Sequence, residues 1–147
     1  IGICTLFLLD TLQAYRKLGW AEAGNAPQQV FDKHVRNAIK NPWLRPYAER
    51  SFLNKRLILN DAGAANALLR MNTRQMHWLP SERTLIRQPI LFSAAGRHEE
   101  ALQMYAKTST RYPKLNRHML AFCEKHPNPK LEELCHAARD SSRDHAE

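Results

Sequence analysis

Glycine, cysteine and long apolar runs are scarce in this sequence, and each scarcity excludes a class of protein. Five glycines, with no long stretch of alternating apolar and polar residues, argue against a β-sheet protein. Three cysteines are too few for a disulfide scaffold. The longest apolar run, residues 1–9, is far shorter than the ~20 residues of a membrane-spanning helix. The 147 residues, 44% apolar and 24% charged, instead match one ordinary globular domain.

The apolar run at the start has two interpretations. It carries no basic segment before it and no small-residue cleavage site after it, so it is not a signal peptide. It fits an amphipathic helix buried in the core, and it also fits the trailing end of a transmembrane helix. The chain opens on Ile1 rather than Met, which favours the second interpretation and a longer parent protein. We therefore predict that residues 1–20 are the end of a last transmembrane helix and a linker.

The rest of the chain has the spacing of helices. Prolines recur at intervals, and a 3–4-residue apolar period follows each of them, as at helix first turns. Helical segments are predicted over residues 25–39, 46–58, 60–77, 80–96, 98–111, 114–125 and 129–139. The segment after Pro46 is expected to turn five side chains inward: Tyr47, Phe52, Leu53, Leu57 and Ile58. The prediction is an all-α domain of seven or eight helices over residues 21–140, with a fraying polar tail at 141–147.

A period of 33 residues runs through the second half of the chain. It relates Gly63 to Gly96 and Pro129, and Pro80 to Pro113. The best copy, residues 81–113, fits the tetratricopeptide pattern of two antiparallel helices, with Ala101 at the close crossing of the helices. Pro89 departs from that pattern and is expected to kink the first helix. Stacked hairpins of this kind present a concave groove to a partner, so a stand-alone peptide-binding adaptor is one candidate function.

Charge points to an anionic partner. The chain has 22 Lys and Arg against 14 Asp and Glu, a net charge of +8. Residues 33–97 hold twelve of the basic residues and only three of the acidic ones. Arginines four residues apart, Arg70 with Arg74 and Arg83 with Arg87, could form a ridge for phosphate or carboxylate groups. A solvated face is the simpler explanation, and the lack of a recognition motif or aromatic platform argues against nucleic acid.

Chemistry-bearing residues are few. No phosphate loop, nucleophile elbow or paired-carboxylate motif occurs, so we assign no catalytic residue, cofactor or metal to this chain. Cys123 and Cys135 allow three interpretations: two buried thiols, a disulfide between consecutive helices, or half of a zinc site. The zinc site would need His118, His126 or His136, and their spacing matches no known finger. Cys4 has no evident partner.

The segment from Arg70 to Pro113 resembles the C-terminal domain of bacterial protein O-oligosaccharyltransferases, the pilin-glycosylation ligases of the O-antigen ligase and polymerase superfamily. The resemblance rests on the following positions: Arg74, Pro80, Arg87-Gln88, Ala95 to Arg97, Glu100-Ala101 and Tyr112-Pro113. Asp10, Tyr15 and the Asn-Pro-Trp-Leu stretch at Asn41 to Leu44 add to it.

The resemblance implies a parent enzyme in the bacterial inner membrane that transfers a glycan from undecaprenyl diphosphate to Ser or Thr of pilin or another periplasmic protein. The family's catalytic histidine lies upstream of the matching region, so no catalytic role passes to this chain. A periplasmic helical domain that helps to dock the acceptor or to shape the site is expected. Its candidate binding residues are Arg70, Arg74, Arg83, Arg87 and Arg97, and an anionic lipid surface is a further candidate partner. Arg16-Lys17 conflicts with this placement, because basic residues beside a membrane helix favour the cytoplasmic side.

Overall fold

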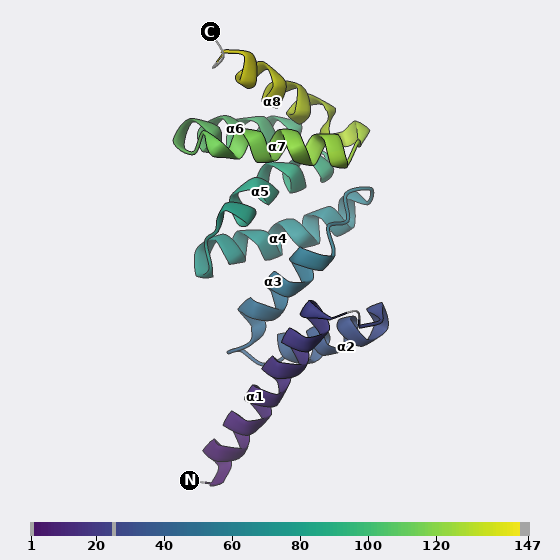
Figure 1. Ribbon diagram of the computed structural model, residues 1–147, viewed down its shortest axis with the longest axis vertical. Coiled ribbons are helices and arrows are strands. Elements are labelled where there is room, and N and C mark those ends of the chain that lie inside the picture. The colour runs from purple at the N-terminus through teal and green to yellow at the C-terminus, as the bar shows by residue number, and fades with distance from the viewer. Residues whose placement is uncertain (1, 25, 145–147) are drawn as a thin grey trace. The chain divides into compact units, whose positions relative to one another are not determined.

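The computed structural model describes residues 2–24 and 26–144, and every regular element in this part of the chain is helical (Figure 1). Eight α-helices and one 3₁₀ turn follow one another, with no strand among the described residues. The all-α prediction is confirmed. The helices form two compact units, Ile1–Arg56 (unit 1) and Leu57–Glu147 (unit 2). Each unit is described by itself below.

Unit 1 contains α1 (Gly2–Ala23), α2 (Gln28–Ile39) and α3 (Arg45–Lys55). Its core contains Leu18 and Ala21 from α1, Phe31 and Val35 from α2, and Ala48 from α3. The predicted boundary between residues 20 and 21 therefore falls inside α1. The last turns of α1 pack against α2 and α3 and belong to the same core.

The first half of α1 is exposed, which contradicts an amphipathic helix buried in the core. Ile3, Leu6 and Leu9 are 86%, 68% and 52% exposed. Among the described residues, no helix is both long enough and apolar enough to cross a membrane. Two residues named in these predictions lie outside the described part of the chain. They are Ile1, the first residue of the apolar run, and Asn25, the first residue of the segment predicted over residues 25–39.

Unit 2 contains five α-helices and the 3₁₀ turn. They are α4 (Ala62–Trp78), α5 (Glu82–Ala94), α6 (His98–Arg111), α7 (Lys114–Lys125), η1 (Pro129–Leu131) and α8 (Glu132–Asp144). α5 packs against α4 and α6, and α8 packs against α6 and α7. Figure 1 shows α6 and α7 lying next to each other across this unit. The polar tail predicted at 141–147 is shorter, because α8 continues to Asp144; residues 145–147 lie outside the described part.

Local sequence explains where the helices of unit 2 begin and end. The Ser81 hydroxyl accepts a hydrogen bond from the Thr84 amide, and the Thr84 hydroxyl accepts one from the Ser81 amide, so α5 begins in a capping box. Asp61 caps α4 through the Ala64 amide. Gly96 ends α5 with a φ of 82°, a conformation that glycine adopts without a steric penalty. α5 continues through Pro89.

The 33-residue period has a counterpart in the burial pattern of the even-numbered helices. Leu68 of α4, Ala101 of α6 and Leu134 of α8 lie 33 residues apart, and all are at most 2% exposed. Asn72, Tyr105 and Ala138, four residues further on, are buried as well. The repeat therefore records the faces that α4, α6 and α8 bury, which is the pattern expected of stacked hairpins.

Two expectations about the core after Pro46 are wrong. Tyr47 is exposed on α3, where it contacts the Tyr15 ring and the Arg50 guanidinium. Ile58 is 38% exposed, because α3 ends at Lys55 and Ile58 follows in an irregular segment. The helical period that predicted its inward direction does not extend that far.

Candidate functional site

A buried polar seam joins α4 to α5. The Asn72 amide group donates to the Thr84 carbonyl at 2.8 Å and to Gln88 Oε1 at 2.6 Å. Gln88 Nε2 in turn donates to the Thr73 hydroxyl at 3.0 Å. Asn72, Thr84 and Gln88 are at most 4% exposed, and so is Gln75 beside them. Because buried polar groups are costly without partners, these bonds fix the register of α4 against α5.

Four of the five candidate arginines lie on the two helices that this seam joins. Arg70 on α4 and Arg83 on α5 are exposed, whereas Arg74 and Arg87 are half-buried. Burial lowers the pKa of Arg87, and the nearby positive charge of Arg83 lowers that pKa further. Arg83 and Arg87 therefore act on each other electrostatically, as their four-residue spacing predicts. The accessible cations of this group are Arg70 and Arg83, one on each helix.

Arg97 does not belong with the other four. It stands beyond the C-terminal end of α5, while Arg83 and Arg87 lie in the first half of that helix. Its guanidinium donates to both carboxylate oxygens of Glu100, at 2.6 and 2.5 Å, and lies 4.7 Å from the centre of the Phe92 ring. The hydrogen bonds with Glu100 are the main cause that raises the pKa of Arg97 and lowers that of Glu100. Arg97 thus braces the α5–α6 turn.

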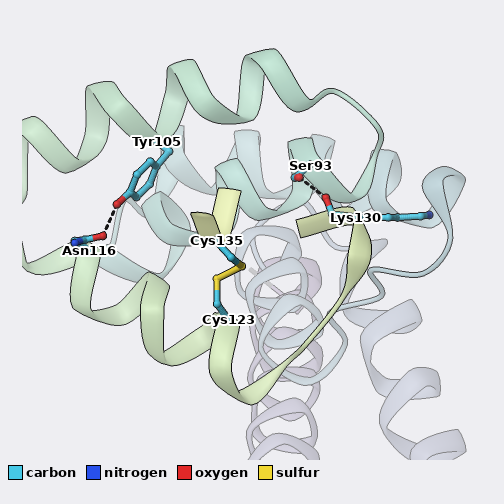
Figure 2. Close-up of a disulfide and its surroundings, with 6 residues drawn as sticks. All are labelled: Ser93, Tyr105, Asn116, Cys123, Lys130 and Cys135. Atoms are coloured by element: carbon cyan, nitrogen blue, oxygen red, sulfur yellow. Dashed lines mark hydrogen bonds between the residues drawn. A yellow bond between two sulfur atoms is a disulfide. The ribbon is translucent and has the colours of Figure 1, made fainter. Parts of the chain in front are cut away.

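Cys123 and Cys135 form a disulfide that connects α7 to α8 (Figure 2). Of the three interpretations of these cysteines, the structure contains this one, and it leaves neither sulfur free to bind zinc. Figure 2 also shows the Ser93 hydroxyl donating to the Lys130 carbonyl at 2.5 Å, and the Tyr105 hydroxyl donating to Asn116 Oδ1. These contacts tie the α7–α8 pair to α5 and α6.

An open groove of about 720 Å³ lies along α6, η1 and α8. Its charged lining is mostly acidic, in a chain whose net charge is +8. The titratable residues that line it are His98, Lys130, Glu132, Glu133, His136 and Asp140. His136 Nδ1 lies 2.9 Å from Asp140 Oδ2, an ion pair when the histidine is protonated. Sequence reasoning missed this groove, although Glu99-Glu100 and Glu132-Glu133 at the 33-residue offset signalled acidic first turns on both α6 and α8.

Taken together, the fold and these surfaces define a basic all-α protein of helical hairpins, with a polar seam, an arginine pair and an acidic groove. Among the described residues no three His, Cys, Asp or Glu side chains are grouped so that they could hold a metal ion. Comparison with models of protein families, with curated proteins and with solved structures finds no match for this chain.

Proposed function

We propose that this chain is a non-catalytic helical domain of a membrane O-oligosaccharyltransferase and that it helps to dock the acceptor protein. The observation that carries the proposal is the α5–α6 hairpin, whose shape depends on the residues of the family resemblance. Gln88 lies in the buried seam, Gly96 makes the turn, and Arg97 pairs with Glu100. Ala101 is 1% exposed at the α5–α6 packing face. These residues of the resemblance all belong to one helical hairpin, which supports the proposal.

The disulfide supports the periplasmic side of the membrane. Disulfides persist in oxidising compartments such as the bacterial periplasm and are rare in the cytosol. The Cys123–Cys135 bond thus opposes the cytoplasmic placement that Arg16-Lys17 favours. The exposed apolar half of α1 supports contact with a membrane, because exposed apolar patches of this extent mark an interaction surface.

Acceptor docking would use Arg70 and Arg83. Arg74 and Arg87 are half-buried and Arg97 is engaged by Glu100, so these three are less accessible to a partner. Exposed guanidinium groups on two adjacent helices can bind carboxylates of an acceptor protein or the phosphates of a lipid-linked glycan.

The docking role is tested by charge reversal at the two accessible arginines. The variant R70E/R83E should lose binding to purified pilin-type acceptor in a surface-capture assay. The matched control K107E/R117E makes the same change in net charge at exposed positions of α6 and α7 and should bind like the wild type. Equal binding by both variants would contradict a docking role for the arginines.

The acidic groove favours a second candidate, a peptide-binding adaptor for a basic segment. Glu132, Glu133 and Asp140 present carboxylates along this groove of about 720 Å³. The variant E133Q/D140N should then lose binding to lysine-rich peptides on an array, while R70E/R83E should retain it. An array on which acidic and basic peptides bind equally would exclude this candidate.

A further inference from the structure

The start of α1, residues 2–9, exposes large apolar side chains around the whole circumference of the helix. Residues 6–9 are consecutive, so their side chains point in four directions 100° apart around the helix. All four are large and apolar, and they are 47–68% exposed. Residues 2–9 contain no charged side chain. A surface helix that packs against one partner carries an apolar stripe, whereas a helix that is apolar all round is surrounded by apolar material.

A ring of aromatic and basic side chains follows this apolar end. We call it the collar: Tyr15, Arg16, Lys17 and Trp20 of α1, with Tyr47 and Arg50 of α3. The rings of Tyr15 and Tyr47 meet edge to face at 5.9 Å, and the Arg50 guanidinium lies 5.4 Å from the centre of the Tyr47 ring. Trp20 is 61% exposed. Tyrosine and tryptophan beside lysine and arginine are the residues enriched where a bilayer meets water.

Two hollows in the collar offer room for a small anionic group. One, of about 380 Å³, is lined by Gln13, Arg16, Lys17 and Trp20. The other, of about 250 Å³, has Arg16, Trp20, Tyr15, Tyr47 and Arg50 in its lining, and also the carboxylate-bearing Glu22. Arg16 and Trp20 line both hollows, so a ligand at either one meets a guanidinium and an indole. The volumes suit a phosphate with part of its glycerol rather than a whole cofactor.

The acidic groups near the collar do not cancel its charge. Glu22 accepts hydrogen bonds from the Ser51 hydroxyl at 2.6 Å and from the Asn54 amide at 3.2 Å, which orient its carboxylate but leave its charge in place. The cations Arg16, Lys17 and Arg50 outnumber this one carboxylate. Asp10 lies exposed between the apolar end and the collar. Unit 1 as a whole has nine Lys and Arg against four Asp and Glu. The collar therefore faces its surroundings with a positive field.

The apolar end and the collar occupy successive parts of α1. At a rise of about 1.5 Å per residue, residues 2–9 extend over about 12 Å of the helix axis. Arg16 and Lys17 follow about 10–12 Å further along the helix axis. If the apolar end lies among acyl chains, the collar lies at the depth of the lipid headgroups.

We propose that the apolar end of α1 lies among the acyl chains of a membrane and that the collar binds the phosphate of an anionic phospholipid headgroup. A second copy of the chain is a poorer occupant, because a helix pair would cover only one stripe of the exposed end. The inference does not depend on the glycosyltransferase parent, since it uses only α1 and α3.

Cys4 provides a direct test in the wild-type chain. It is exposed on the apolar end, and the other two cysteines form the disulfide, so a thiol-reactive fluorophore labels this position alone. The emission of a polarity-sensitive label on Cys4 should shift to the blue when vesicles of about 70% phosphatidylcholine and about 30% phosphatidylglycerol are added. The phosphatidylglycerol gives these vesicles an anionic surface. The emission of the same label on C4S/K33C, at an exposed position of α2, should not shift. The proposal would be overturned if the emission of the Cys4 label did not shift when vesicles were added. It would also be overturned if the blue shift occurred without vesicles, through self-association of the protein.

Neutralising the collar tests the phosphate contact. Each basic residue near an anionic surface strengthens binding about five-fold, so R16Q/K17Q should bind these vesicles about 25-fold more weakly in a co-sedimentation assay. The control K33Q/R36Q removes the same charge from exposed positions of α2 and should stay within about three-fold of wild type. Circular dichroism checks that both variants fold. If both variants lost vesicle binding equally, net charge alone would explain the loss, and the collar would not be a binding site.

Discussion

Removal of the Cys123–Cys135 disulfide should strongly destabilise unit 2. The two cysteines are 12 residues apart in sequence, and the bond closes a loop that contains the end of α7, η1 and the start of α8. In the chain-entropy model, a loop of this length gives a stabilisation of about 3 kcal/mol. For a unit of this size the melting temperature should fall by roughly 12–24 °C on reduction, since each kcal/mol is worth about 4–8 °C.

Thermal unfolding and urea unfolding, each followed by far-ultraviolet circular dichroism with and without a thiol reductant, measure this effect. The variant C123A/C135A should behave like the reduced wild type, and reductant should not change its unfolding midpoint further. C4S is the matched control, because Cys4 is exposed on α1 and takes no part in the bond. Before reduction, one thiol per unfolded chain should react with a thiol reagent, and three afterwards. An unchanged midpoint on reduction, or three reactive thiols before it, would refute the reasoning.

The remaining predictions concern packing, capping and pH. Leu91→Ala should cost about 2–5 kcal/mol of unfolding free energy, because Leu91 is fully buried, whereas exposed Leu12→Ala should cost under about 0.5 kcal/mol in the same urea titration. Ser81→Ala should cost about 1 kcal/mol, through loss of the capping box of α5. Burial raises the pKa of Tyr105 above 10.0, although a hydrogen bond with Ser141 partly offsets this. The folded form therefore keeps its proton at a pH where the unfolded form ionises, so stability should fall as pH rises above about 10, and Tyr105→Phe should reduce that slope. A slope that Tyr105→Phe leaves unchanged would contradict this assignment.

The helical architecture could be predicted because its determinants are local. Ser81 begins α5 by capping it and Gly96 ends it by its positive φ, and both signals can be recognised from a few neighbouring residues. The 33-residue period marks the buried faces of α4, α6 and α8. The division into two units could not be predicted in this way. It depends on Leu18 and Ala21 packing against α2 and α3, which is a contact between segments distant in sequence. Tyr47 was expected inside for the same reason, because a helical period gives the apolar face but not the partner that covers it.

The candidate sites also combine features that local sequence predicts with features that depend on packing between helices. The sequence pattern identified five arginines by charge, but only burial and partners distinguish accessible Arg70 and Arg83 from Arg97, which is held by Glu100. The groove is formed by residues of both α6 and α8, so it could not be predicted from either segment alone. The collar likewise combines Trp20 with Tyr47, residues that only the α1–α3 packing brings together.

The central claim is that this chain is a docking domain of an O-oligosaccharyltransferase, and one transfer assay tests it most directly. The proposed parent enzyme is supplied with an undecaprenyl-diphosphate-linked oligosaccharide and a pilin-type acceptor, and the glycosylated acceptor is quantified by mass. The account predicts glycan on a Ser or Thr of the acceptor with the wild type and with K107E/R117E, and a large loss with R70E/R83E. Absence of transfer by the wild type would contradict the family proposal, and equal transfer by R70E/R83E would contradict the docking role.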